Sequence, residues 1–207
     1  MTIQTSNTSD TAEIPRLSVI VPAYNEEENI VPLAEEIIAA LNNLPGGFEL
    51  ILVDDASTDA TKRTIEQFKH DKVRAVFHRI NCGQSAAVGS GFHAARGDWV
   101  ATLDGDGQND PADLPAMLEL AIKEGVDCVT GVRAKRQDTF IRRFSSKTAN
   151  GFRNWITGDQ VSDSGCGIRV VRRAALHEIP VFNGMHRFLP TLLRGQGFTV
   201  KETHVNH

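Results

Sequence analysis

The most informative segment of this chain is Val100-Ala-Thr-Leu-Asp-Gly-Asp-Gly-Gln-Asn-Asp-Pro111. A short apolar run ends in two aspartates separated by one glycine. Residues two apart in an extended segment point to the same side, so Asp104 and Asp106 can direct both carboxylates to one point beyond a strand end. Mg²⁺ is often bound by one or two carboxylates together with substrate phosphates. The pattern therefore indicates a metal–diphosphate site, and the alternative is a solvated acidic turn, because Asp and Gly are common in turns.

Apolar segments rich in β-branched residues alternate with helical segments on both sides of this stretch. Strands are predicted at residues 17–22, 48–53, 73–77, 99–103 and 128–130. Helices are predicted at residues 25–41, 57–69, 83–96 and 110–123. This alternation predicts an α/β fold with a mostly parallel sheet covered by helices on both faces. Ligands of such open sheets bind beyond the carboxyl ends of the strands, where three polar clusters fall, at residues 24–26, 54–55 and 104–108.

Local signals suggest how these helices begin and pack. Asn25 is expected to open the first helix, with Glu26 to Glu28 in its first turn, because acidic side chains suit a helix N-terminus. Ser57 or Thr58 is expected to cap the second helix. The third helix has a face of small residues that allows close packing on a sheet: Ala86, Ala87, Ser90, Gly91, Ala94 and Ala95.

The pattern becomes irregular after Gly131. Residues 133–147 combine six basic side chains and one acidic side chain with interleaved aromatic residues. If this segment is helical, its apolar stripe either lies on a membrane beside anionic head groups or packs into the core with solvated charges outside. A loop from residue 163 then enters a strand that ends near residue 171. A short helix at 187–194 and a last strand at 198–205 complete the prediction.

Composition limits the function classes. The chain has 207 residues, a net charge of −4 and 41% hydrophobic residues, which is globular composition and disfavours a general nucleic-acid binder. Three cysteines without metal-ligand spacing are typical of reduced thiols in a cytosolic setting. Residues 1–16 have the composition of a disordered tail, and residues 17–207 are long enough for one domain. No uncharged apolar run approaches the ~18 residues of a membrane span.

Several motifs occur in one order along the chain. They are Val19-Ile-Val-Pro-Ala-Tyr-Asn-Glu-Glu27, Val53-Asp-Asp-Ala-Ser-Thr-Asp59, Asn81-Cys-Gly-Gln84, Asp104-Gly-Asp-Gly-Gln108 and Asp163-Ser-Gly-Cys-Gly-Ile-Arg169. As a set they resemble the inverting family-two glycosyltransferases, and within them the dolichol-phosphate mannosyltransferase-like branch that moves a sugar onto a polyprenyl phosphate. The resemblance covers residue 17 to the C-terminus and implies the GT-A α/β architecture.

The resemblance assigns roles residue by residue. It implies a Mg²⁺ or Mn²⁺ ion held by Asp104, Asp106 and Gln108. It implies that the nucleotide-sugar donor is bound by Pro22, Ala23, Tyr24, Glu26, Asp54, Asp55, Gly83 and Gln84. The arginines Arg133 and Arg169 resemble those near the acceptor phosphate and the donor diphosphate, and the basic run adds Arg142 and Arg143 as acceptor-phosphate candidates.

The acceptor decides whether a general base is needed. A hydroxyl acceptor needs a base within hydrogen-bond reach. A phosphate monoester has a second pKa near ~6, so its oxygen is largely deprotonated at neutral pH and needs cations to position it. We see no obvious base motif in the second half of the chain, which fits a polyprenyl-phosphate acceptor, and Asp163 is the reserve candidate for a base.

Two other functions stay open at this stage. One is the same transfer to a hydroxyl of a saccharide or lipid, and the other is a nucleotide-sugar-binding module without turnover. In many relatives an arginine-containing loop, and often membrane helices, follow the last strand. We therefore expect a catalytic domain that ends before such a segment and works at the cytoplasmic face of a membrane.

Overall fold

The computed structural model describes residues 2–3, 14–133 and 166–206. The strands are β1 (Thr2–Ile3), β2 (Leu17–Ala23), β3 (Phe48–Asp54), β4 (Val73–Phe77), β5 (Trp99–Thr102), β6 (Cys128–Arg133), β7 (Arg169–Arg172) and β8 (Val200–Val205). The helices are α1 (Ile30–Leu41), α2 (Thr61–Gln67), α3 (Gln84–Ala94), α4 (Asp113–Glu124), the 3₁₀ turn η1 (Arg173–Leu176) and α6 (Met185–Gly195).

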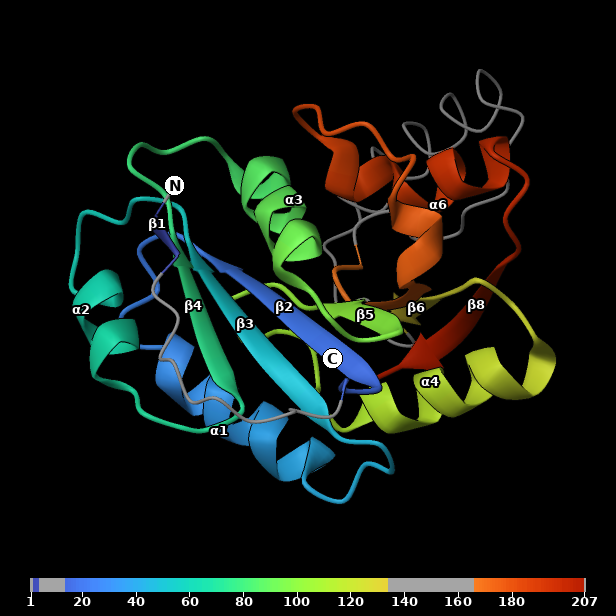
Figure 1. Cartoon of the computed structure of the whole chain (residues 1–207), viewed down its shortest axis with the longest axis horizontal. Coiled ribbons are helices and arrows are strands. Elements are labelled where there is room, and N and C mark those ends of the chain that lie inside the picture. Colours follow the sequence, from blue (N-terminus) through green and yellow to red (C-terminus); the bar gives the residue numbers. More distant parts are fainter. Residues whose placement is uncertain (1, 4–13, 134–165, 207) are drawn as a thin grey trace, which may run out of the picture.

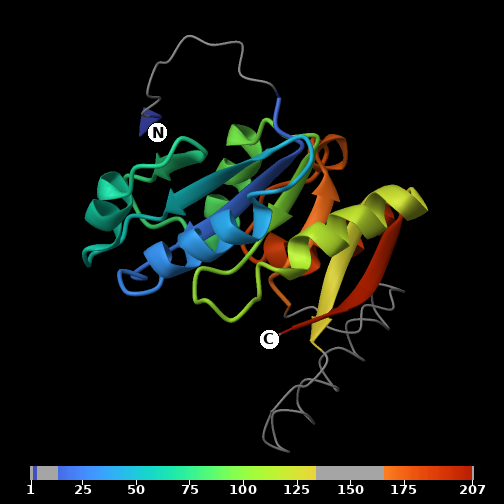
Figure 2. The ribbon, with the colours of Figure 1, turned by 90° about the horizontal axis from the view of Figure 1, so that it is seen from below.

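One mixed sheet organises the described residues, in the order β1-β4-β3-β2-β5-β7-β6-β8. Pairings of β2 with β3 and β5, of β3 with β4, and of β6 with β8 are parallel. The strand β7 runs antiparallel to both of its neighbours, β5 and β6. Figure 1 and Figure 2 show the sheet between two layers of helices. The predicted α/β fold with a mostly parallel sheet is confirmed.

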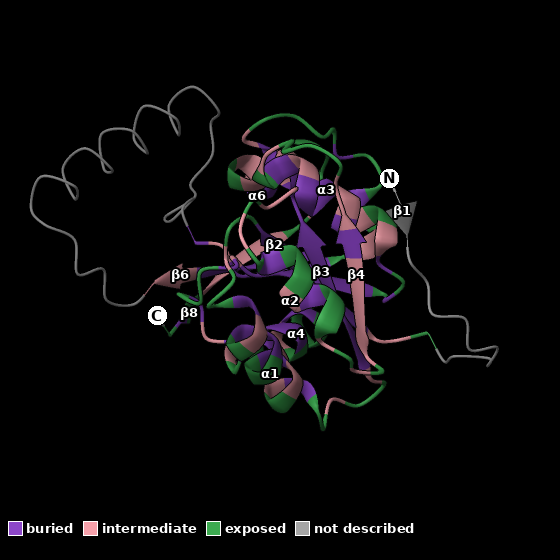
Figure 3. Cartoon of the chain, turned by 90° about the vertical axis from the view of Figure 1, so that its left-hand side faces the viewer, coloured by how far each residue is buried: buried purple, intermediate pink, exposed green. Residues whose placement is uncertain are grey.

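The central strands bury both faces, as parallel strands covered by helices must. Along β2, Leu17 and Val19 pack in a core with α1, α2 and α4, whereas Ile20 packs in the opposite core with α3 and α6. All three side chains are fully buried. Figure 3 shows β3 buried along its length, whereas β4 beside it is mostly of intermediate burial. Successive side chains of a strand therefore pack alternately into the two cores, which explains why these strands are almost continuously apolar.

The predicted boundaries hold within a few residues, but two helix starts are wrong. α1 begins at Ile30, and Glu26 to Glu28 lie in the turn before it. That turn is held by tertiary contacts, since the backbone N–H of Glu26 donates to Thr61 Oγ1 at 2.8 Å. α2 begins at Thr61, after the expected caps, and Asp59 Oδ1 accepts the N–H of Thr61.

The chain ends also differ in part from the prediction. Thr2–Ile3 form β1, which pairs antiparallel with β4, so at these two residues the predicted disordered tail is wrong. The last strand begins at Val200, two residues later than predicted. In the described part of the chain no helix has both the length and the apolar character needed to cross a membrane.

The small-residue face of α3 is confirmed at its closest approach to the sheet. A methyl group added at Gly91 would lie 2.4 Å from Ile20 Cγ2 on β2. Ile20 is fully buried. Gly91 therefore lets α3 sit close enough to the sheet to cover Ile20.

We expect Gly91→Ala to lower the free energy of unfolding by about 1–3 kcal/mol, the usual cost of an extra methyl group in a packed core. Urea unfolding at 25 °C measures this value. Gly195→Ala is the matched control, because no atom lies within 4 Å of an added methyl group there. A Gly91→Ala protein as stable as the wild type would contradict the packing described here.

Candidate active site

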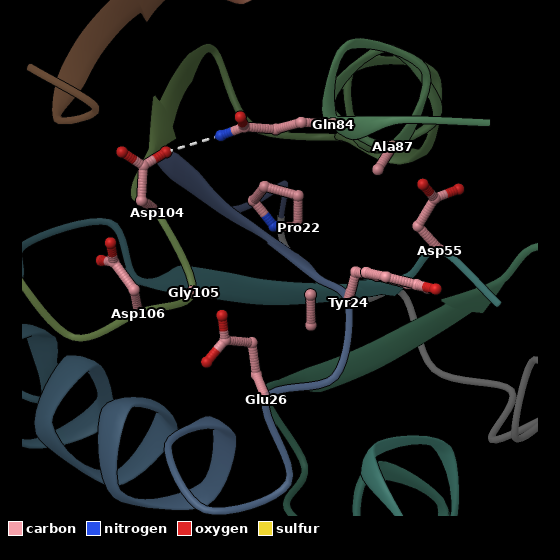
Figure 4. Close-up of a pocket in the computed structure, with 10 residues that line it drawn as sticks. Pro22, Tyr24, Glu26, Asp55, Gln84, Ala87, Asp104, Gly105 and Asp106 are labelled. Carbon is pink, nitrogen blue, oxygen red and sulfur yellow. Dashed lines mark hydrogen bonds between the residues drawn. The ribbon is translucent and has the colours of Figure 1, made fainter. Parts of the chain in front are cut away.

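A pocket of about 250 Å³ opens at the carboxyl ends of β2 and β5. From β2 the chain passes to β3 and β4 on one side and then returns to β5 on the other, which makes this the switch point of the sheet. Crevices at such switch points are where open α/β sheets bind ligands. The pocket is lined by Pro22, Ala23, Tyr24, Glu26, Asp55, Gln84, Ala87, Asp104, Gly105 and Asp106 (Figure 4).

The turn after β2 is tied to the loop after β3. Asn25 adopts a positive φ of 58°, and its side-chain oxygen accepts the backbone N–H of Thr58 at 2.8 Å. The Asn25 N–H in turn donates to Ser57 Oγ at 3.0 Å. These contacts fix the pocket wall that carries Tyr24, whose residue surface is 45% exposed. The Tyr24 ring is therefore presented to solvent and to any ligand in the pocket.

Asp55 is buried and held by three donors from the next segment of chain. Its Oδ1 accepts the N–H of Cys82 at 2.9 Å and lies 2.6 Å from His78 Nδ1. Its Oδ2 accepts the N–H of Gly83 at 2.7 Å. Gly83 has a φ of +85°, a conformation that glycine adopts without strain just before α3. Asp55 thus joins the end of β3 to the start of α3.

Asp104 lies one residue beyond Leu103, which follows β5. Its Oδ1 accepts a hydrogen bond of 2.7 Å from the side-chain amide of Gln84, at the start of α3 (Figure 4). On its other side lies Gly167, where an added methyl group would be 2.1 Å from Asp104 Oδ2. The Gly167 carbonyl accepts the hydroxyl of Thr102 at 3.0 Å, which holds this backbone beside β5. The Asp104 carboxylate is therefore confined on two sides.

Burial raises the pKa of the Asp104 carboxyl above its usual value. Arg169 opposes this rise, the neighbouring Asp106 carboxylate adds to it, and Gln84 and Arg133 oppose it further. Arg169 is only 4% exposed and stands opposite Thr102 in the register of β7 with β5. Two acids and buried positive charge thus meet at one edge of the pocket, where a divalent cation would offset the repulsion between the carboxylates.

Asp106 completes the acidic pair from an exposed position on the same loop. Its Oδ1 accepts the N–H of Gln108 at 3.1 Å. Figure 4 shows Asp104 and Asp106 on the same side of the pocket. The intervening Gly105 is needed because a methyl group there would lie 2.7 Å from the Pro22 carbonyl oxygen. Two adjacent carboxylates with open coordination space fit the oxygen-ligand chemistry of Mg²⁺ or Mn²⁺.

Most of the predicted donor residues meet in this pocket, but Asp54 and Gly83 do not line it, and neither does the predicted metal ligand Gln108. Asp54 is fully buried, and its carboxylate faces the Ser57 N–H at 3.4 Å, so it shapes the turn and does not line the pocket. Gly83 contributes through its bond to Asp55 and does not line the pocket itself. Gln108 is exposed and also lies outside the lining. The candidates Asp163, Arg142 and Arg143, like most of the basic run, fall outside the described residues.

Three residues of this region were not predicted from the sequence. His78 anchors Asp55, and its Nε2 lies 2.8 Å from Ser90 Oγ on α3. His186 on α6 shares a hydrogen bond of 2.8 Å with Ser85, next to Gln84, and burial lowers its pKa to about 4, which keeps it neutral at pH 7. Gly167 confines Asp104. Only Gly167 has a sequence signal, since it lies in the motif that ends at Arg169.

The family model for glycosyl transferase family 2 matches residues 18–180. This match covers well over half of the chain and includes every residue that lines the pocket. The chain therefore belongs to glycosyl transferase family 2, as the order of its motifs predicted.

Two curated relatives narrow the comparison. The chain is 38% identical over 192 residues to a dodecaprenyl-phosphate galacturonate synthase of Rhizobium johnstonii, a match that covers 91% of this chain and 57% of the relative. It is 38% identical over 183 residues to an undecaprenyl-phosphate 4-deoxy-4-formamido-L-arabinose transferase of Pectobacterium carotovorum, covering 87% of this chain and 56% of the relative. The chain thus spans a little over half the length of these relatives.

Solved structures confirm the GT-A fold. A mannosyltransferase from Pyrobaculum calidifontis, in complex with GDP-Man and Mn²⁺, superposes with a TM-score of 0.69 at 20% identity, covering 98% of this chain and 59% of that one. Glucosyl-3-phosphoglycerate synthase from Mycobacterium tuberculosis, in complex with Mn²⁺, UDP and phosphoglyceric acid, gives a TM-score of 0.72 at 20% identity, covering 93% and 69%.

The raised pKa of Asp104 predicts a pH-dependent stability change. Its folded-state pKa lies above its unfolded value, so the folded protein holds the proton more tightly, and ionising the group costs stability once the pH rises through both values. Asp104→Asn removes this cost. We expect the metal-free Asp104→Asn protein to melt at a higher temperature than the wild type at pH 7.

Thermal unfolding in EDTA from pH 7 down to pH 4 measures this effect. The advantage of Asp104→Asn is expected to shrink toward pH 4, where the wild-type carboxyl takes up its proton. A variant that melts below the wild type at pH 7 would show that the favourable contacts of the carboxylate with Gln84 and Arg169 outweigh the cost of its burial.

Proposed function

We propose that this chain is the catalytic part of a glycosyltransferase that moves a sugar from a nucleoside diphosphate sugar to a polyprenyl phosphate. The observation that carries the proposal is the acidic pair Asp104 and Asp106 in the switch-point pocket, with the buried Arg169 close enough to Asp104 to oppose the rise of its pKa. The proposed acceptor is supported by two relatives, one a dodecaprenyl-phosphate sugar synthase and the other an undecaprenyl-phosphate sugar transferase by name. We place the reaction at the cytoplasmic face of a membrane, where nucleotide sugars are available.

Departure of the nucleoside diphosphate places negative charge on its outer phosphate. A Mg²⁺ or Mn²⁺ ion at Asp104 and Asp106 would supply Lewis-acid stabilisation of that charge. Arg169 offers a planar guanidinium that suits phosphate oxygens and stays charged at every relevant pH. Gln84 and Gly167 keep the Asp104 carboxylate in place before the donor arrives. Such preorganisation lowers the barrier because little rearrangement is left for the transition state.

An acceptor phosphate oxygen is its own nucleophile. A phosphate monoester is mostly ionised at neutral pH, so the site needs no general base, only cations that hold the acceptor near the sugar. Arg133 lies at the end of β6, close enough to Asp104 to lower its pKa. Among the described residues it is our candidate for the contact with the acceptor phosphate. The roles of Arg142, Arg143 and Asp163 remain predictions from the sequence.

The acceptor chemistry is tested with a UDP-sugar donor, Mn²⁺ and two lipids of equal length, a polyprenyl phosphate and the corresponding polyprenol. We expect product with the polyprenyl phosphate and none with the polyprenol. Asp106→Ala is expected to lower the rate of product formation at least a hundredfold. Asp71→Ala is the control, because Asp71 is an exposed aspartate outside the pocket. Transfer to the polyprenol would favour a hydroxyl acceptor, and donor binding without any product would favour a non-catalytic module.

The contacts of Asp55 lead us to propose uracil as the base of the donor. Oδ1 already accepts two hydrogen bonds and Oδ2 accepts one, so Oδ2 retains a single acceptor position for a ligand. Uracil presents one ring N–H between two carbonyl groups, which matches one acceptor. Guanine presents two adjacent donors, at N1 and N2, which a carboxylate satisfies only with both oxygens free.

We expect UDP to bind at least tenfold more tightly than GDP or CDP in the presence of Mn²⁺. The three nucleotides share the diphosphate, so isothermal titration reports the difference in the base alone. Cytosine has an acceptor at N3 and its donor on the amino group at C4, so CDP tests whether the ring N–H of uracil makes the contact. Equal or tighter binding of GDP would contradict the role given to Asp55, while metal-independent binding of all three would contradict the role of Asp106.

A further inference from the structure

A second pocket, of about 560 Å³, lies at the opposite end of the central strands from the donor pocket. Its walls come from the amino-terminal ends of β2 and β5, the end of β7 and the last turns of α4. They include Arg16, Asp98, Trp99, Ile122, Arg172 and Arg173. None of the residues of this pocket lines the donor pocket, and the full length of β5 separates the two.

This pocket is cationic in a chain whose net charge is negative. Three arginines line it against one aspartate, Asp98, whereas the whole chain carries a charge of −4. Arg172 is already engaged, because its Nε lies 3.5 Å from Asp127 Oδ1 and its guanidinium sits over the Trp99 ring at 5.5 Å. Arg16 and Arg173 have no side-chain hydrogen bond or ion pair with any residue that the structure describes. Two guanidinium groups therefore remain available to a ligand.

Arg173 gives the sharper signal of the two. Its Nε is buried and has no hydrogen-bond partner among the described residues. Buried polar groups in proteins are nearly always hydrogen-bonded, so each exception requires a reason. Arg173 is also fixed in place, because its backbone N–H donates to the Asp98 carbonyl at 2.9 Å. The Arg173 backbone is therefore anchored, and no described residue competes for the guanidinium that the side chain presents to the pocket.

The pocket also offers an apolar wall. Ile122 is 40% exposed here, although it belongs to a helix whose other face is buried in the core. The Trp99 ring, which the Arg172 guanidinium overlies, also lines the pocket. A volume near 560 Å³ is in the range of pockets that bind small molecules. Size, charge and apolar surface together fit a small anion with an organic group.

We propose that this pocket binds a small phosphate ester, with the phosphate on Arg16 and Arg173 and the organic group against Ile122. Arginine binds phosphate through two parallel N–H donors, which lysine cannot reproduce. Arg16 immediately precedes β2 and Arg173 begins η1, so the two arginines are far apart in the sequence and the site exists only in the folded chain. The proposal does not rest on the catalytic function, because the two pockets share no residue.

Trp99 allows this proposal to be tested by fluorescence. The chain has two tryptophans, so Trp155→Phe leaves Trp99 as the sole reporter. The Trp155→Phe protein is titrated with inorganic phosphate and with phenyl phosphate, in EDTA and at constant ionic strength. EDTA removes divalent ions, which prevents metal-dependent binding of phosphate at Asp104 and Asp106. We expect saturable changes with both probes and at least fivefold tighter binding of phenyl phosphate.

Charge-matched variants decide the outcome. Arg173→Gln is expected to weaken phenyl phosphate binding at least tenfold, whereas Arg63→Gln, on the exposed side of α2, is expected to leave it unchanged. Arg16→Gln provides a second test if Arg173→Gln does not fold. Asp106→Ala is expected to abolish Mn²⁺-dependent UDP binding without affecting phenyl phosphate. A titration that does not saturate, or equal affinity of the Arg16→Gln, Arg173→Gln and Arg63→Gln proteins, would overturn the proposal.

Discussion

The confinement of the Asp104 carboxylate is the constraint on which the rest of the site depends. A buried carboxylate is costly unless it is paired or hydrogen-bonded, and here burial raises its pKa despite the nearby Arg169. The Asp104 carboxylate lies between the Gln84 amide and the backbone of Gly167. The ionised Asp104 carboxylate thus lowers the stability of the fold, and such perturbed groups are common at functional sites. A cation bound beside Asp104 and Asp106 would return part of that stability.

The topology of the sheet brings the required groups to this position. Parallel strands β2, β3 and β5 place the turn after Ala23, the Asp55 carboxylate and the acidic loop at one edge. The antiparallel strand β7 then returns from the other direction, so that Gly167 and Arg169 arrive beside the end of β5. A purely parallel sheet would place the residues before β7 at the far edge. Strand β7, which is antiparallel to both of its neighbours, therefore supplies the buried positive charge that opposes the two acids.

The sequence predicted the strand positions because each central strand is apolar on both faces, and it predicted the acidic pair because of its spacing. It could not separate Asp54 from Asp55, since neighbours on a strand point to opposite sides and only the register decides which one faces the pocket. It misplaced the start of α1 because the Glu26 N–H is bound by Thr61, thirty-five residues away. His78 and His186 were missed for the same reason, as their partners Asp55 and Ser85 are distant in sequence.

We propose that the backbone at Gly167 holds Asp104 where it could bind a metal ion, and Mn²⁺ affinity tests this proposal most directly. Electron paramagnetic resonance counts free Mn²⁺ during titration of the wild type, Gly167→Ala and the control Gly195→Ala. A methyl group at residue 167 would lie 2.1 Å from Asp104 Oδ2, so the carboxylate must move. Mn²⁺ binding at least tenfold weaker in Gly167→Ala alone, with the fold intact by circular dichroism, is the predicted result. Wild-type Mn²⁺ affinity in a folded Gly167→Ala protein would contradict the role given to the Gly167 backbone.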